Sequence, residues 1–378
     1  MTTPLRIVFL GLSITSSWGN GHATTYRSLI RGLHSLGHDV LFLERDVPWY
    51  ADHRDLPRPE YCELGLYNDR GDLIRWDSEI ARADAVILGS YVPDGVAIAD
   101  YVLDTACGVT AFYDIDTPVT LAKLMRGEEE YVSRTAIPRF DLYLSFTGGP
   151  TLRRLEQEFG AQRAEALYCS VDEERYRPAD EPANWDLGYL GTYSDDRQPT
   201  LERLLLEPAR KLPDRRFVVA GPQYPSTIAW PANVDRIEHL PPERHPEFYS
   251  RQRYTLNVTR ADMIAAGWSP SVRLFEAAAC GTPIISDYWP GLDELLPAGE
   301  AAIIAAGAED VVRAITGNTD AERVRLAINA RSRILQSHTG RARAAELASC
   351  LTEARSAAGR RLSSVRVKEL DESLASID

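Results

Sequence analysis

Three stretches of the chain combine residue types that could bind an anion, hold hydroxyl groups or move a proton. The first, Ser16–His22, reads SSWGNGH and ends in Gly19, Asn20, Gly21 and His22. Glycines let a backbone approach a ligand closely, and the amides that open a helix attract anions and hydroxyl groups. This stretch is a candidate substrate loop with His22 as its proton-transfer group. An ordinary strand-to-helix turn with a solvent-exposed histidine explains it equally well.

The second stretch is a pair of carboxylates, Asp114 and Asp116, within the sequence YDIDTP. Side chains two residues apart point to the same side of an extended backbone. The pair could supply a general base, hydroxyl ligands or a divalent-metal site. Alternatively, Asp116 or Thr117 caps a helix that begins at Pro118, because proline is favoured at the first helical position. The two interpretations can hold together, with Asp114 facing a cleft and Asp116 at the cap.

The third stretch, Ser269–Gly281, predicts a helix of about three turns. A serine and a proline suit its start, and a glycine suits its end. Its first amides can hold a diphosphate. Glu276 lies among apolar residues, where a carboxylate needs a partner. A ribose diol is one such partner, and a buried salt bridge to Arg273 is the alternative.

Short, continuously apolar strands alternate with helices and must position these three stretches. Such strands are typical of a parallel sheet covered on both faces. The pattern begins at Leu5–Leu10 and restarts at Trp185–Leu190. The strands expected after each start are Val40–Leu43, Ala85–Leu88, Val109–Tyr113 and Leu142–Phe146 in the first set, and Phe217–Ala220, Tyr254–Val258, Pro283–Ser286 and Ala302–Ile304 in the second.

This repeated pattern predicts two doubly wound α/β domains, at residues 1–178 and 179–355. The boundary falls in the charged, proline-containing stretch Glu173–Asn184. Residues 356–378 form a polar tail that could pack back on the first domain. Two such domains imply a cleft between them, and open α/β sheets bind ligands outside the carboxyl ends of their strands.

Composition and charge exclude several classes of protein. The chain has 378 residues with 42 basic and 55 acidic side chains, a formal net charge of −13, which disfavours binding to nucleic acid or to an anionic membrane. Its five widely spaced cysteines indicate neither a zinc site nor a disulfide framework. No apolar run approaches the length of a membrane helix. We therefore expect a cytoplasmic protein.

The run Val272–Asp287, VRLFEAAACGTPIISD, resembles the nucleotide-binding stretch of GT-B glycosyltransferases related to family 4, and its nearest likeness is the CgeB-type subgroup. Supporting motifs follow in the family's order: the opening strand, glycine loop and helix of Leu5–Gly37, the strand Asp141–Ser145, the VDxxxYxP motif of Val171–Pro178, and a phosphate loop from Gly191 onward. The resemblance implies two Rossmann-like domains that face each other across a cleft. It also implies transfer of a sugar from a nucleotide-diphosphate sugar, with retention at the anomeric carbon.

The resemblance also implies a donor site in the second domain. Glu276 would hold the ribose, and the diphosphate would lie on the amides of Ser271 and Val272 beside Arg197. The phosphate loop includes Gly191 and Thr192, and Arg260 and Arg273 are further phosphate partners. Two departures stand out. Trp268 replaces the first glutamate of the family's paired motif, and in the phosphate loop Thr192 and Arg197 replace the usual arginine and lysine.

The acceptor, a small molecule or a glycan, is expected on the first domain near Gly19–His22 and Asp114. No cofactor and no metal are implied. Two alternatives stay open: a GT-B nucleotide-sugar epimerase that recruits Asp114, Asp116 and His22 around the sugar ring, and a non-catalytic relic that binds a sugar nucleotide, suggested by Trp268.

Overall fold

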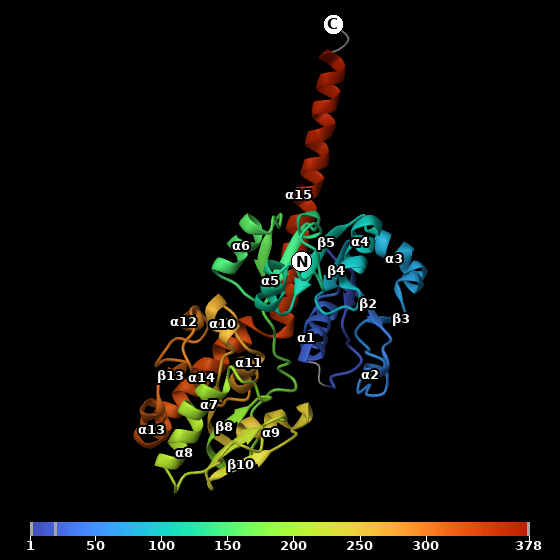
Figure 1. Cartoon of the computed structure of the whole chain (residues 1–378). Helices are drawn as coiled ribbons and strands as arrows, with labels where there is room; N and C mark the ends of the chain where they lie inside the picture. The colour runs from blue at the N-terminus through green and yellow to red at the C-terminus, as the bar shows by residue number, and fades with distance from the viewer. Residues whose placement is uncertain (1–2, 19–20, 376–378) are drawn as a thin grey trace. The chain divides into compact units, whose positions relative to one another are not determined.

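The computed structural model describes residues 3–18 and 21–375, with side chains described as far as residue 357. The chain divides into two compact units (Figure 1). Unit 1 comprises the described residues up to Ser145, Leu152–Leu167, and the described residues from Arg343 onward. Unit 2 comprises Phe146–Thr151 and Tyr168–Ala342. No described helix is both long and apolar enough to cross a membrane.

Unit 1 is built on a seven-stranded sheet in the order β3-β2-β1-β4-β5-β6-β7, in which every strand pair is parallel. Its strands are β1 (Arg6–Gly11), β2 (Asp39–Arg45), β3 (Glu63–Tyr67), β4 (Ala85–Gly89), β5 (Val109–Asp114), β6 (Leu142–Ser145) and β7 (Ala164–Ala166). The strand order reverses between β1 and β4, which creates a switch point at the carboxyl edge of this sheet.

Helices separate these strands along the chain: α1 (Gly21–Ser35), α2 (Pro48–Ala51), η1 (Arg70–Trp76), α3 (Asp77–Arg82), α4 (Gly95–Thr105), α5 (Thr117–Met125), η2 (Ile137–Arg139) and α6 (Pro150–Glu158). The long helix α15 (Gly340–Ala375), red in Figure 1, ends the described chain. Each inner strand is almost wholly buried, as in β4 and β5, because helices shield both faces of a parallel sheet.

Unit 2 is built on a six-stranded parallel sheet in the order β10-β9-β8-β11-β12-β13. Its strands are β8 (Trp185–Leu190), β9 (Phe217–Ala220), β10 (Val234–Ile237), β11 (Gln252–Asn257), β12 (Ile284–Ser286) and β13 (Ala302–Ile304). Its helices are α7 (Gln198–Leu201), η3 (Glu202–Leu206), α8 (Glu207–Lys211), η4 (Pro242–Arg244), α9 (His245–Ser250), α10 (Ala261–Ala266), α11 (Val272–Ala279), α12 (Leu292–Leu295), α13 (Ala308–Gly317) and α14 (Asp320–Ser337). Both units are therefore Rossmann-like α/β domains, as predicted.

Three strands have no counterpart in the sequence prediction, namely β3, β7 and β10. All three lie at the edge of their sheet. An edge strand pairs on one side only and keeps more polar residues, so the apolar run that signals an inner strand is weak there. In β10, for example, Asp235 and Arg236 occupy two of four positions.

The units differ from the predicted division at residue 178 in three ways. Residues 168–178, predicted in the first domain, group with unit 2. Residues from Arg343 onward group with unit 1, where Arg163 pairs with Glu353 on α15 at 2.8 Å and Arg355 pairs with Asp84. The short segment Phe146–Thr151 groups with unit 2. These exchanges depend on contacts between residues far apart in sequence, so local composition contains no sign of them.

Candidate functional site

The amino end of α11 presents backbone amides and a cationic neighbourhood. The helix begins at Val272, two residues later than the sequence indicates, and Ser271 occupies the N-cap position without a side-chain bond to the helix amides. The Ser271 hydroxyl donates instead to Asn257 Oδ1 at 2.9 Å. Asn257 is the last residue of β11, so the carboxyl end of a central strand fixes this helix start. The first amides of α11 therefore keep their capacity to bind an anion.

Three arginines, Arg197, Arg260 and Arg273, gather beside this helix. Burial, together with the neighbouring charges of Arg273 and Arg260, lowers the pKa of Arg197. The Arg197 Nη2 atom donates to the carbonyl oxygen of Thr192 at 2.7 Å, and its buried Nε has no acceptor among the described residues. Like charges in one place raise the free energy of the protein unless an anion compensates them.

Arg273 is the most firmly held of the three. Its Nη1 donates to Asn257 Oδ1 at 3.0 Å, its Nε donates to the Leu190 carbonyl, and its guanidinium lies over the Tyr189 ring at 4.8 Å. In the part of the chain with described side chains, no ion pair joins Arg197, Arg260 or Arg273 to a carboxylate. The cluster therefore lacks direct ion pairs, although the charge of Arg273 does act on Asp287, where it opposes the rise in pKa that burial causes.

Gly191 makes room for this arginine cluster. A Cβ atom on Gly191 would lie 2.5 Å from Tyr189 Oη and 2.9 Å from Arg273 Nη2. On Gly221, whose φ is +139°, a Cβ would lie 2.1 Å from the Gly191 carbonyl oxygen. The exposed Thr192 follows and supplies the carbonyl that orients Arg197. A close backbone approach and a positive φ thus explain the glycine at Gly221, and the packing of two side chains against the backbone explains the one at Gly191.

Glu276 lies inside α11 with 6% of its surface exposed. Its Oε2 accepts from the Tyr249 hydroxyl at 3.0 Å and lies 3.8 Å from His245 Nδ1. The alternative of a buried pair with Arg273 is not what the structure has, because Arg273 turns to Asn257 and Leu190 instead. A phenol is a neutral partner that leaves the carboxylate lone pairs for further donors.

Trp268 occupies a strained position just before α11, with φ at +41°. Its amide donates to the Pro290 carbonyl at 2.6 Å, and its Nε1 donates to Glu294 Oε2 at 2.9 Å. A Cβ on Gly149 or Gly291 would lie 2.5 or 2.6 Å from the indole, so two glycines receive the ring. The indole also lines a cavity of about 140 Å³ with Tyr168, Pro270, Trp289, Gly291, Glu294, Leu295 and His338.

In unit 1, Asp114 was predicted to face a cleft, but the structure places it in the core. The residue is fully buried. Its Oδ2 accepts from the Tyr143 hydroxyl at 2.6 Å, and its Oδ1 accepts from the Thr120 hydroxyl at 2.8 Å and the Asp116 amide at 3.3 Å. Burial raises the pKa of Asp114 to about 6, although the Tyr143 and Thr120 bonds oppose the shift. Because β5 extends through Asp114, its side chain packs into the interior, and the structure gives it a structural position.

His22, Tyr91 and Asp116 instead come together at the carboxyl edge of this sheet. The His22 ring meets the Tyr91 ring edge-on at 4.8 Å, and the Tyr91 hydroxyl donates to Asp116 Oδ2 at 3.0 Å. Burial lowers the pKa of His22 to about 4, so its imidazole is neutral at pH 7. Asp116 holds the N-cap position of α5, as one interpretation predicted, but without a side-chain cap bond.

The remaining predicted residues of this loop divide into two groups. Gly21 opens α1, and a Cβ there would meet nothing within 4 Å, so space does not require glycine at this position. Gly19 and Asn20 lie outside the described residues. Two residues that the sequence analysis did not single out, Asn257 and Tyr91, could have been found as polar side chains at or just after the carboxyl end of a strand.

Comparisons with known proteins agree with the fold of this chain. Residues 197–349 match the family model described as glycosyl transferase-like. Among solved structures, sucrose-phosphate synthase from Thermosynechococcus elongatus aligns over 93% of this chain and 100% of its own, with a TM-score of 0.66 and 14% identity. Anabaena HepE in complex with UDP and glucose aligns over 92% and 100%, with a TM-score of 0.65 and 13% identity.

The chain has the GT-B fold, and its residues 197–349 are similar to the glycosyl transferase-like family. An alpha-glucosyltransferase in complex with UDP and a 13-mer DNA also shares this fold, at 13% identity and a TM-score of 0.66 over 93% of this chain and 100% of that one. A curated relative, the D-inositol 3-phosphate glycosyltransferase of Mycobacterium sp. (strain KMS), is 27% identical over 168 residues. That match covers 38% of this chain, and the chain spans only 36% of the relative's length.

The matched segment of this GT-B chain contains Arg197, Arg260, Trp268, Ser271, Val272, Arg273 and Glu276, whereas Gly191 and Thr192 lie just before it. Among the described residues, no group of three His, Cys, Asp or Glu side chains is placed to hold a metal ion. The likeness to the CgeB-type subgroup stays a prediction.

Proposed function

We propose that this protein is a glycosyltransferase that moves a sugar from a nucleotide-diphosphate sugar to an acceptor. The observation that carries the proposal is the cluster of Arg197, Arg260 and Arg273 at the amino end of α11, none of which forms an ion pair with a carboxylate among the residues with described side chains. A diphosphate is the anion that fits three guanidinium groups beside helix amides. The matched family and the UDP complexes of the structural relatives support the same ligand class.

The proposed donor site has two parts within unit 2. Val272 and the arginines hold the diphosphate, and Glu276 holds the ribose hydroxyls. The arginine charges stabilise the negative charge that develops on the leaving diphosphate as the glycosidic bond breaks, which is where such a site lowers the barrier most. This proposal needs no cofactor besides the nucleotide sugar, and activity is expected to persist in EDTA. Retention at the anomeric carbon is part of the proposal, as the family resemblance implies.

The proposed acceptor side is the carboxyl edge of unit 1, where His22, Tyr91 and Asp116 lie together. A neutral imidazole can accept a proton, and a carboxylate can orient an acceptor hydroxyl. His22 therefore replaces Asp114 as the favoured proton-transfer group. Asp116 is the favoured carboxylate, because it is not sealed into the core as Asp114 is.

Calorimetry with UDP, UDP-glucose and uridine tests the donor site. Removing one charged hydrogen-bonding partner costs about 1.5–3 kcal/mol. Arg197→Ala should therefore weaken UDP and UDP-glucose about 10- to 150-fold and leave uridine unchanged, because Arg197 is assigned to phosphate alone. Arg203→Ala is the matched control, since Arg203 is an exposed arginine of the same unit that bonds only to Thr200.

Two results would contradict this assignment. Equal losses for uridine and UDP in Arg197→Ala would show that the residue acts on the nucleoside or on folding. A wild-type protein that binds none of UDP, GDP, ADP, TDP and CDP would remove the proposed function altogether. Incubation with UDP-glucose alone, followed by NMR, distinguishes transfer or hydrolysis from formation of an epimer.

A further inference from the structure

Two exposed tryptophans and a histidine gather where the loops after β1 and β2 meet. Trp18 is 46% exposed and Trp49 is 61% exposed, both unusual for residues of this size. The Trp18 and His53 rings stack with centroids 4.5 Å apart and planes 14° apart, and the Trp49 ring lies 6.0 Å from His53. We call Trp18, Trp49 and His53 the aromatic patch. Apolar surface held in water in this way marks a binding site.

Buried polar bonds hold the loop that carries Trp18 in one conformation. Glu44, fully buried at the end of β2, accepts from the Ile14 and Thr15 amides at 2.7 and 3.0 Å. It also accepts from the hydroxyls of Ser13 and Thr15 at 3.0 and 2.6 Å. One carboxylate thus has four donors from a single loop, which makes the loop a rigid support.

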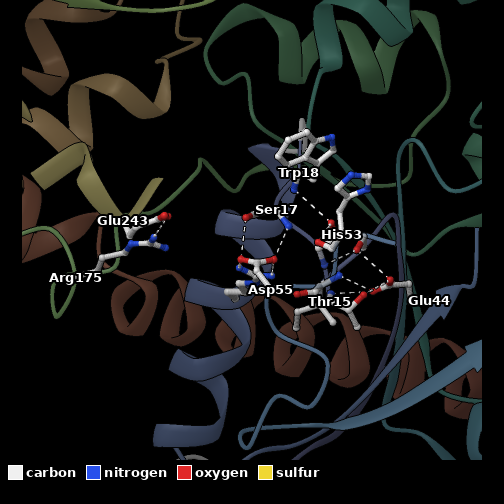
Figure 2. A network of polar contacts seen from close by, with 12 residues as sticks. Thr15, Ser17, Trp18, Glu44, His53, Asp55, Arg175 and Glu243 are labelled. Atoms are coloured by element: carbon white, nitrogen blue, oxygen red, sulfur yellow. Dashed lines mark hydrogen bonds and ion pairs between the residues drawn. The ribbon is translucent and has the colours of Figure 1, made fainter. Parts of the chain in front are cut away.

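A second carboxylate, Asp55, ties the two loops together. It accepts from the Ser17 amide and hydroxyl at 2.8 and 2.9 Å and from both Nη atoms of Arg27 at 2.8 Å. Although burial opposes the shift, hydrogen bonds from Arg27 and Ser17 hold the pKa of Asp55 below its usual range. In Figure 2 the Trp18 indole and the His53 imidazole lie above the carboxylates of Asp55 and Glu44. The patch is therefore preorganised, which reduces the entropy cost of binding.

The aromatic patch lies at the edge of unit 1 where an acceptor is expected. The loops that follow β1 and β2 leave the carboxyl ends of these strands, and β1 borders the switch point with β4. The same edge carries His22, at the start of α1, four residues after Trp18. The aromatic patch and the proposed proton-transfer residue therefore belong to segments that leave the same edge of this sheet.

The charges around the aromatic patch favour a neutral ligand. Arg27 is paired with Asp55, and Arg54 is paired with Asp46 at 2.6 Å, so both cations that contact this loop are already neutralised. The net charge of −13 further disfavours an anionic lipid surface. A sugar ring has the complementary form, because its C–H face lies flat on an indole while its hydroxyl groups at the edge reach polar neighbours.

We infer that the aromatic patch binds a neutral sugar ring of the acceptor, so that the acceptor is a glycan or a glycoside. The inference rests on the proposed function for its location and on the patch for its chemistry. Trp18 and His53 form the platform, and Trp49 extends it toward a second ring of the chain. These residues position the acceptor and take no part in the transfer of the sugar.

The test uses saturation-transfer NMR and calorimetry with three neutral probes: maltotetraose, cellotetraose and chitotetraose. At least one should bind the wild type. Trp18→Ala and Trp49→Ala should each weaken it about tenfold or more, while UDP binding stays unchanged in both. Ile74→Ala is the matched control, since Ile74 is 71% exposed in the same unit and lies in η1, away from the patch loops in sequence. It should bind the sugar as the wild type does.

Other outcomes would overturn the inference. It fails if none of the three oligosaccharides binds, or if both tryptophan variants bind sugar as well as the wild type. It also fails if the tryptophans are needed instead for binding to phosphatidylcholine–phosphatidylglycerol vesicles, which would identify a membrane surface. If the wild-type protein binds an oligosaccharide but does not bind UDP, the proposed nucleotide-sugar donor is rejected, whereas the sugar site on the aromatic patch is supported. The two failures are therefore distinguishable.

Discussion

Asp114→Asn separates a structural carboxyl group from a catalytic one. Asparagine has nearly the same shape, and its amide oxygen can still accept from the Thr120 hydroxyl and the Asp116 amide. Its amide nitrogen can donate to the Tyr143 oxygen, which reverses that one bond. The substitution therefore removes the titration of Asp114 while it keeps the packing of a fully buried site.

The magnitude follows from the pKa of Asp114, which burial raises from 3.8 to about 6. A carboxyl whose pKa is raised in the folded state stabilises the fold at low pH, and this stability is lost as the pH rises through the folded value. At about 1.4 kcal/mol per pH unit, the whole effect is about 3 kcal/mol, and about 2 kcal/mol of it falls between pH 4 and 7.5. The free energy of unfolding of Asp114→Asn, relative to wild type, should rise by that amount over this range.

Urea denaturation at pH 4, 5.5 and 7.5 measures this difference, with the unit 1 transition followed separately if the two units unfold apart. Asp52→Asn is the control, because Asp52 is an exposed carboxylate of the same unit and is not among the groups that shift the pKa of Asp114. If the difference in free energy of unfolding between Asp114→Asn and the wild type does not change from pH 4 to 7.5, burial does not raise the pKa of Asp114 as we infer. A collapse of turnover by about 100-fold at pH 7.5 with normal stability and UDP affinity would instead show that Asp114 takes part in catalysis.

Three further predictions test other parts of the molecule. Burial lowers the pKa of His22 to about 4, so the neutral imidazole of the folded state should make the free energy of unfolding of the wild type fall by about 2 kcal/mol from pH 7 to pH 5. Thermal denaturation at the two pH values should show that His22→Gln does not have this decrease. Glu276→Ala should weaken UDP by about 1–3 kcal/mol in calorimetry with the fold intact, and unchanged affinity would make Glu276 a structural residue. Gly149 has a φ of +58°, and a Cβ there would lie 2.5 Å from the Trp268 ring, so Gly149→Ala should lower the free energy of unfolding by about 2–4 kcal/mol in urea denaturation. Gly299 has a φ of +72° and nothing within 4 Å of such a Cβ, so Gly299→Ala should lower it by only about 1–2 kcal/mol.

Local sequence was sufficient for the architecture of both units. Inner strands of a parallel sheet are apolar along nearly their whole length, so apolar runs such as Ile7–Leu10 and Phe217–Ala220 predict strands from the sequence alone. The helix α11 was predicted from local signals, a serine, a proline and a closing glycine, but its start was placed two residues too early, because the N-cap is Ser271. The edge strands β3, β7 and β10 were missed because one-sided pairing leaves no continuous apolar run.

The tertiary structure alone decided which polar residues gather and which are sealed away. Asp114 and Asp116 are two residues apart and chemically identical, yet β5 ends at Asp114 and places it in the core, while Asp116 meets Tyr91. The sequence named Arg197, Arg260 and Arg273 individually, but their shared electrostatic field depends on the starts of α7, α10 and α11, which the paired strands β8 and β11 bring together. Burial and charge coupling arise from residues distant along the chain, so no local pattern contains them.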